Sequence, residues 1–294
     1  MEFFFDLTVN GLLVGLMYSL VALGFVLIYK ATSVINFAQG DLMMFAAYGA
    51  AVMLGLGWLP LWAIVPILFA GMIVLGFVLE RGILRPLIGQ PVISVIMGTI
   101  GLTFVLQGVA AIFWGAVTRE LPLPVRLEPY IVSGVFVSPI NVVAAVTAIL
   151  CLIGFGLFFT RSRMGIAMRA VADDQQAAMT AGINVRRMFA LSWAIAGLAA
   201  AAGGIIWGNM LGVDTFLALV GLKVFPVVIL GGLDSIAGVI LGGLIVGGVE
   251  SLAAGYLDPY VGGGTKDFIP YLLMIIVLFI RPYGFFGREI IERV

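Results

Sequence analysis

Long uncharged runs of apolar residues dominate the chain, and they occupy residues 7–29, 42–79, 87–118, 129–160 and 188–213. Each run exceeds the roughly 20 apolar residues that a membrane-spanning helix needs. The runs are continuous, whereas the strands of a membrane barrel alternate between apolar and polar residues. The pattern therefore predicts an all-α fold, a polytopic bundle of transmembrane helices formed by residues 1–294 as a single domain.

Polar residues between and within the runs divide them into individual helices. We expect helices close to residues 7–29, 34–56, 59–79, 92–114, 139–159, 188–207, 211–254 and 268–280. A full helical hairpin in 211–254 gives nine spans, a re-entrant hairpin gives seven, and the sequence leaves both open. Glu2 and Asp6 precede the first run in place of the basic region of a signal peptide, so this run is expected to be a retained span.

The most polar segment between two apolar runs is 161–187, which reads RSRMGIAMRAVADDQQAAMTAGINVRR. Its apolar positions follow one line at helical spacing, made up of Met164, Met168, Val171 and Ala178. Its polar positions follow a second line, made up of Arg169, Asp173, Gln176 and Thr180. Two such lines predict an amphipathic helix at the membrane surface. A helix of this kind suits docking into the groove of a partner, and an ordinary helical cytoplasmic loop is the alternative.

The same segment carries signals for helix ends. Gly182 can adopt the left-handed conformation that terminates many helices. Asn184 is a suitable N-cap for the apolar helix that follows. We therefore expect the surface helix to end before Gly182 and the next spanning helix to begin after Asn184.

Two apolar segments, one in each half of the chain, are interrupted at Gln39–Asp41 and at Gly231–Ser235. Paired interruptions are typical of a solute path between inverted repeats. The backbone groups that an interruption exposes are tolerated at membrane depth only inside protein or beside a water-filled cavity. In the alternative interpretation, Asp41 and Asp234 are N-caps of ordinary helices. The sequence keeps both interpretations open.

Lys223 lies in the largely apolar segment 211–254. It either reaches the outer membrane interface or neutralises an acidic group inside the bundle. Pairs of glycines four residues apart predict close helix packing, because small residues let backbones approach. These pairs are Gly11/Gly15, Gly204/Gly208, Gly238/Gly242 and Gly243/Gly247.

Composition agrees with a membrane protein and narrows its function. The chain is 63% hydrophobic and 10% charged, and its net charge of zero gives no electrostatic reason to bind nucleic acid. It has no histidine and one cysteine, Cys151, so disulfides, metal sites and nucleophile–base catalysis are not expected. The sequence 262–266, GGGTK, lacks the spacing of a phosphate-binding loop. If ATP drives transport, another chain hydrolyses it.

Orientation follows from the basic residues, which favour the cytoplasmic side. If 161–187 is cytoplasmic, alternation of the spans places most basic residues inside, namely the five arginines of this segment, Lys30, Arg81, Arg85, Arg281, Arg288 and Arg293. The basic residues outside are Arg119, Arg126 and Lys266, with Lys223 undecided. We therefore expect the N-terminus outside and the C-terminus in the cytoplasm.

Three motifs resemble those of the branched-chain amino-acid (Liv-type) permease family of ABC importers. They are NFAQGD at 36–41, RAVADD with AGINV at 169–174 and 181–185, and LGGLDSIAG at 230–238. The resemblance covers the whole chain, with the motifs in the family's order. It implies a permease subunit in the bacterial inner membrane that is not itself an enzyme. The substrate would be a branched-chain or other hydrophobic amino acid, or a related small amide.

The resemblance also implies partners and roles for individual residues. A second related permease, two ABC ATPase subunits and a periplasmic substrate-binding protein would complete the importer, with ATP bound by the ATPase subunits and no cofactor on this chain. Segment 161–187 would be the coupling segment, with contacts to the ATPase expected at Arg169, Asp173, Asp174, Gln176, Ala181 and Gly182. The translocation path would include Asn36, Gln39, Gly40, Asp41, Gly231, Gly232, Asp234 and Ser235. A secondary transporter or channel for a small solute is the alternative function.

Overall fold

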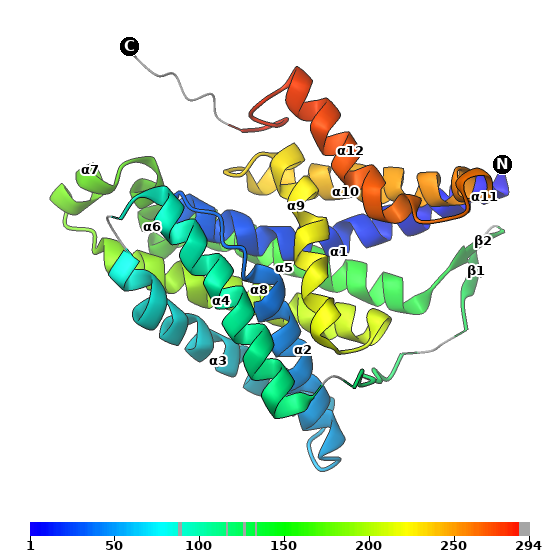
Figure 1. The fold of residues 1–294 in the computed structure, drawn as a ribbon, viewed down its shortest axis with the longest axis horizontal. Coiled ribbons are helices and arrows are strands. Elements are labelled where there is room, and N and C mark those ends of the chain that lie inside the picture. Colours follow the sequence, from blue (N-terminus) through cyan, green and yellow to red (C-terminus); the bar gives the residue numbers. More distant parts are fainter. Residues whose placement is uncertain (88–89, 116, 126–127, 133, 288–294) are drawn as a thin grey trace. The chain divides into compact units, whose positions relative to one another are not determined.

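The computed structural model describes residues 1–87, 90–115, 117–125, 128–132 and 134–287, and these residues are mainly helical (Figure 1). Arg126, Arg288 and Arg293, which enter the orientation argument, lie outside the described residues. The helices are α1 (Glu2–Thr32), α2 (Gln39–Gly55), α3 (Leu61–Leu79), α4 (Val92–Trp114), α5 (Pro139–Arg161), α6 (Arg163–Asp173), α7 (Gln175–Thr180), α8 (Val185–Leu211), α9 (Leu219–Gly231), α10 (Ile236–Tyr256), α11 (Asp258–Val261) and α12 (Thr265–Ile280).

Shorter elements complete the fold. A π-helical turn, η1 (Glu80–Leu84), continues α3 and is followed by the 3-10 turn η2 (Arg85–Leu87), and a second 3-10 turn, η3 (Thr215–Ala218), precedes α9. Strands β1 (Tyr130–Val132) and β2 (Val135–Val137) pair antiparallel in the loop between α4 and α5. Gly134 between them has a φ of 84°, and the β-branched residues on both sides favour strands.

Six helices among the described residues are long and apolar enough to cross a membrane. They are α1, α3 with its continuation to Leu87, α4, α5, α8 and α10. The predicted boundaries agree with these helices to within a few residues, because length and apolarity identify them. In segment 211–254 only α10 has this length, since the apolar helix Thr215–Gly231 is shorter. The segment is therefore not a hairpin of two full-length spanning helices.

The interruption at 231–235 is confirmed, and the one near residue 39 lies earlier than expected. Helix α9 ends at Gly231, Gly232 has a φ of 97°, and the Ser235 hydroxyl accepts a hydrogen bond from the Gly238 N–H at 3.0 Å, which caps α10. In the first half, the non-helical residues precede α2, so Gln39–Asp41 form the first turn of that helix.

Contacts divide the chain into two compact units, with boundaries within α1, α5 and α9 and one between residues 123 and 124, after α4. Unit 1 comprises 1–26, 124–150 and 223–294, and unit 2 comprises 27–123 and 151–222.

In unit 2, α8 packs against α2 and α3. Gly204 of α8 contacts the backbone at Met43 of α2, and Gly197 contacts the backbone at Met72 of α3. Small residues therefore bring the three helices close together, at Gly204 as the glycine spacing predicted and at Gly197 outside the predicted pairs.

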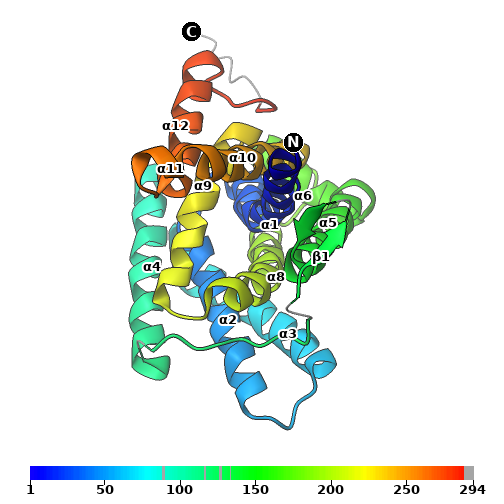
Figure 2. The same cartoon turned by 90° about the vertical axis from the view of Figure 1, so that its right-hand side faces the viewer.

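In unit 1, α1 crosses α10 with their backbones in contact, and both views show the two helices side by side (Figure 2). Gly11 and Gly15 of α1 face Gly243 and Gly247 of α10, so both predicted packing pairs are confirmed. The Ser19 hydroxyl donates to the Gly15 carbonyl at 2.9 Å and contacts the Val239 carbonyl at 3.2 Å. The bond to Val239 adds a polar contact to an interface formed by glycine.

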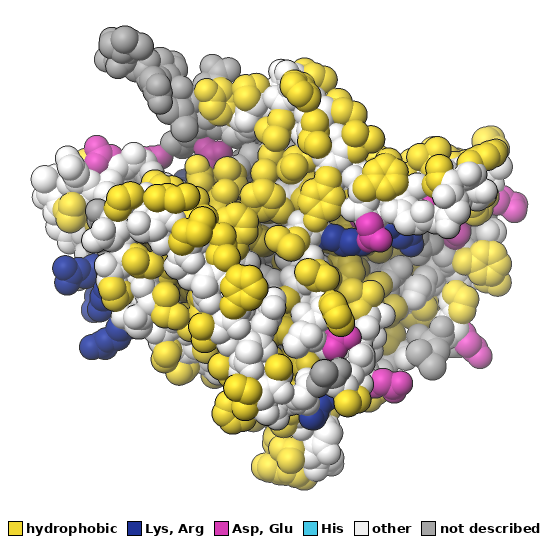
Figure 3. All heavy atoms as spheres, in the orientation of Figure 1, with side chains coloured by type: hydrophobic (Ala, Val, Ile, Leu, Met, Phe, Trp, Pro, Cys, Tyr) yellow, Lys and Arg dark blue, Asp and Glu magenta, His cyan; other side chains and the backbone are white. Residues whose placement is uncertain are grey.

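Lys223 forms an ion pair with Asp267, with Nζ and Oδ1 2.7 Å apart. The Asp267 side chain is 74% exposed and belongs to the first turn of α12. Lys223 therefore neutralises an acidic group, as one of the two expectations proposed, although this group lies at an exposed helix end. Elsewhere the visible face carries many apolar side chains and few charges (Figure 3), as expected of a surface that faces lipid.

Candidate functional site

The polar segment 161–187 begins directly at the end of α5. A single residue, Ser162, separates α5 from α6 and has an extended backbone. Its hydroxyl accepts a hydrogen bond from the Gly165 N–H at 2.9 Å and caps α6. Gly165 lies against the backbone of Phe158 and Phe159, where a Cβ atom would overlap them. A tight turn at Ser162 therefore joins the start of α6 to the last turn of α5.

The predicted single surface helix is in fact two, and Asp174 separates them. Asp174 has φ −156° and ψ 110°, which ends α6 and starts α7. Its Oδ1 accepts hydrogen bonds from the backbone N–H groups of Gln176 and Ala177 at 2.8 and 3.0 Å. Aspartate at this position satisfies N–H groups that an isolated helix leaves unbonded. The expected continuous polar line is therefore wrong beyond Asp173, because the helix axis is interrupted there.

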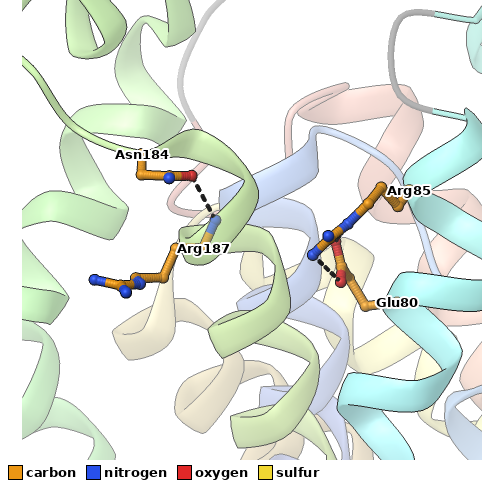
Figure 4. A network of polar contacts seen from close by, with 4 residues as sticks. All are labelled: Glu80, Arg85, Asn184 and Arg187. Carbon is orange, nitrogen blue, oxygen red and sulfur yellow. Dashed lines mark hydrogen bonds and ion pairs between the residues drawn. The ribbon is translucent and has the colours of Figure 1, made fainter.

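The predicted end of the segment is confirmed. Gly182 has a φ of 82°, its N–H donates to the Met179 carbonyl at 3.0 Å, and the Ile183 N–H donates to the Ala178 carbonyl at 2.9 Å. This pair of bonds is a Schellman motif, which commonly ends a helix at glycine. The Asn184 side chain accepts from the Arg187 N–H at 3.1 Å and caps α8 (Figure 4).

The two surface helices have one buried side and one exposed side. Met168, Val171 and Ala178 are buried as predicted, whereas Met164 is 43% exposed and does not join them. The six residues predicted to contact an ATPase are all exposed: Arg169, Asp173, Asp174, Gln176, Ala181 and Gly182. Together they present a capped polar surface that a partner can reach.

The residues before and at the start of α2 are buried and polar. Asn36 Oδ1 accepts from the Ala38 N–H at 3.1 Å, and Gln39 Nε2 donates to the Ala196 carbonyl of α8 at 3.3 Å. Asp41 accepts from Gln107 Nε2 of α4 at 3.0 Å and does not cap α2, so the N-cap interpretation of Asp41 is wrong. The Asp41 carboxylate is therefore bonded to a side chain of another helix and does not serve as the N-cap of α2.

The glycines at the two interruptions are packing positions. A Cβ atom at Gly40 would overlap the Ala218 carbonyl, and Gly221 lies against Gly40. A Cβ atom at Gly232 would overlap the backbone of Gly287. Gly40 and Gly232 belong to different units, so a solute path shared by the two interruptions stays a prediction.

The remaining residues of the second interruption have distinct roles. Gly231 lies against the backbone of Gly238, which brings the end of α9 close to the start of α10. Ser235 supplies the cap of α10, so the N-cap role considered for Asp234 belongs to the next residue. The sequence Asp234-Ser235 offers two capping side chains in succession, and sequence alone does not choose between them.

An ion pair between a buried carboxylate, Glu80, and the partly exposed Arg85 was not predicted from the sequence. Glu80 is 1% exposed, and its two carboxylate oxygens accept from Arg85 Nε at 3.3 Å and Nη2 at 3.0 Å (Figure 4). The pair lies on η1 and η2, where a π-helical turn follows α3. Such turns are frequent at functional sites. Glu80 also lines a cavity of about 210 Å³ in unit 2, together with Asn36, Thr99 and Gln175.

Acidic and cysteine side chains do not gather into a candidate metal centre. In the described part of the chain, no group of three or more His, Cys, Asp or Glu residues could hold a metal ion.

Comparison with known proteins gives matches along nearly the whole chain. A family described as the permease component of branched-chain amino acid transport systems matches residues 7–278. The high-affinity branched-chain amino acid transport system permease protein BraD of Pseudomonas aeruginosa is 34% identical, with 97% of this chain and 96% of that protein covered. The permease protein LivH of Escherichia coli K12 is 31% identical, with 99% and 98% covered. A probable LivH permease of Methanocaldococcus jannaschii is 32% identical, with 92% and 88% covered.

Proposed function

Because the chain belongs to the family of permease components of branched-chain amino acid transport systems, we propose that it carries the solute across the membrane in an ATP-driven importer. Its substrate is a branched-chain or other hydrophobic amino acid, or a related small amide. The six long apolar helices among its described residues make it a multi-pass membrane protein. Family membership does not favour the alternative of a secondary transporter or channel.

The observation that carries the proposal is the capped surface segment α6–α7. It lies between two spanning helices, its buried side packs on the protein, and its exposed side is polar. A short, rigid helix pair of this kind suits insertion into a cleft of another protein. The chain has no phosphate-binding loop of its own, so we place ATP hydrolysis on two separate ATPase subunits. A second related permease and a periplasmic substrate-binding protein complete the assembly.

Replacing Arg169 by glutamate should uncouple transport from ATP hydrolysis. Arg169 is exposed on α6, one helical turn before Asp173, and reversal of its charge places a repulsive group at the proposed interface. We expect solute uptake per ATP hydrolysed to fall by at least about tenfold, which corresponds to a change of about 1.4 kcal/mol. The measurement is uptake and ATPase activity of the complete importer in vesicles.

Arg186→Glu is the matched control, since Arg186 is also exposed but lies on α8 beyond the cap. Equal uncoupling by both variants would indicate a general charge effect. Normal coupling by a well-inserted Arg169→Glu protein would show that Arg169 of α6 is not part of the interface with the ATPase.

We also propose that the chain lies in the bacterial inner membrane with its N-terminus outside, its C-terminus in the cytoplasm and 161–187 in the cytoplasm. With Cys151 replaced by serine, a cysteine at Ile131 in the exposed hairpin should react with an impermeant thiol reagent added to intact cells. A cysteine at Gln176 should react only after the membrane is opened. The reverse pattern would contradict the orientation and the ATPase contact together.

A further inference from the structure

The cavity of unit 2 is large enough for a small solute. Its volume of about 210 Å³ exceeds the space needed for one water by more than tenfold. Five regions surround it: the end of α1, the residues before α2, the turns η1 and η2, the start of α4, and the α7–α8 segment. All of them belong to unit 2, so the shape of the cavity depends on that unit alone.

One part of the cavity wall carries a buried hydrogen-bond donor without a partner. Asn36 is 0% exposed, and its Oδ1 is bonded to the Ala38 N–H. Its Nδ2 has no hydrogen-bond partner in the part of the chain that the structure describes. Buried polar groups are nearly always hydrogen-bonded, so an unpartnered amide that lines a cavity calls for an acceptor on whatever occupies the cavity.

A buried carboxylate also lines the cavity. Glu80 is held by Arg85, but a carboxylate has about four acceptor positions, and it can accept further bonds from an ammonium group. The charges of Glu80 and Arg85 already cancel. An occupant with a net charge would therefore bring an uncompensated charge into the cavity. An occupant that carries one positive and one negative group satisfies this condition.

The other walls are apolar and branched or aromatic. The side chains that form them include Ile28, Val34, Leu84, Val95, Phe189 and Trp193. Such walls favour a branched aliphatic group, which loses contact with water on entry. The cavity thus combines an amide donor and a carboxylate with an apolar chamber.

We propose that this cavity binds a zwitterionic amino acid with a branched aliphatic side chain. The ammonium group faces Glu80, the carboxylate accepts from Asn36 Nδ2, and the side chain fills the apolar chamber. Gln175, the first residue of α7, also lines the cavity, so the occupant contacts the surface segment directly. This assignment rests on the proposed function and adds a substrate site beside the coupling segment.

Cavity filling tests the site in the complete importer. Val95→Phe should occupy the chamber and lower ATP-driven leucine uptake at least tenfold, while Val105→Phe, at a 57% exposed position of the same helix, should change uptake less than twofold. Equal uptake by the two variants would overturn the assignment. Absence of ATP-driven amino acid uptake in the unchanged protein would instead contradict the proposed function.

Photolabelling tests the chemistry without any substitution. A leucine analogue with a diazirine side chain should label peptides containing residues 28–36, 84–95 or 189–193, and excess leucine should prevent it. Isoamylamine and isovalerate, each with one of the two charged groups, should compete at least tenfold less well. Labelling of other peptides, or labelling that leucine does not reduce, would overturn the site and would indicate a lipid chain as occupant.

Discussion

Substitution of Gly243 by valine should prevent α1 and α10 from packing and should leave little folded protein in the membrane. A Cβ atom at Gly243 would overlap the Ser19 hydroxyl and the Gly15 carbonyl, so the two backbones would have to separate. Separation would break the hydrogen bond from Ser19 to the Val239 carbonyl and the glycine contacts together. Overpacking of this kind costs about 3 kcal/mol or more. The yield of monodisperse protein and its Tm in detergent measure the effect.

Gly248→Val on the same helix is the matched control. The nearest atom to a Cβ atom at Gly248 is Leu12 Cδ2, 4.0 Å away, which is an ordinary contact distance. The two variants share the change in helix propensity, because both positions lie inside α10. We expect Gly248→Val to change the free energy of unfolding by less than about 1 kcal/mol, because valine is no less favourable than glycine inside a helix. Equal losses would mean that backbone contact at Gly243 does not account for the effect.

Substitution of Gly165 by valine should abolish most ATP-driven uptake while the protein still inserts in the membrane. The added side chain would overlap the Phe158 carbonyl and displace α6 from the end of α5. Displacement would move the whole polar surface of α6 away from the position at which we propose that it meets the ATPase. We expect uptake per inserted protein to fall at least about thirtyfold, equivalent to about 2 kcal/mol.

Gly154→Val provides the comparison for Gly165. Gly154 lies in α5, and a Cβ atom there would have no neighbour within 4 Å among those considered. Its uptake should stay within about twofold of the unchanged protein, since an exposed apolar side chain on a lipid-facing helix adds no clash. Near-normal uptake by Gly165→Val would show that the position of α6 against α5 does not matter for transport.

The spanning helices could be predicted because their information is local. Helix α4 extends from Val92 to Trp114, as its apolar run predicted, and Gly182 and Asn184 end and start helices as their types favour. The break at Asp174 is harder to predict, since RAVADDQQ remains compatible with one continuous helix. In the folded chain Asp174 is the N-cap of α7, and this cap separates α6 from α7.

The environment of the buried polar groups could not be predicted, because their partners are distant in sequence. Asp41 is bonded to Gln107 of α4, and Gln39 to the Ala196 carbonyl of α8. Asn36 and Glu80 line one cavity although neither is near the other along the chain. A local pattern identified Asn36 and Asp41 as polar residues in an apolar segment. It carried no information about which side chains would meet them.

The single residue between α5 and α6 has a mechanical consequence. A long loop would absorb a displacement of α6 by bending, but Ser162 offers only its own backbone torsions, and its hydroxyl is already bonded to Gly165. Gly165 in turn rests on the last turn of α5. A displacement of α6 would therefore be transmitted directly to α5. It would tilt this spanning helix, because the one-residue connection cannot lengthen.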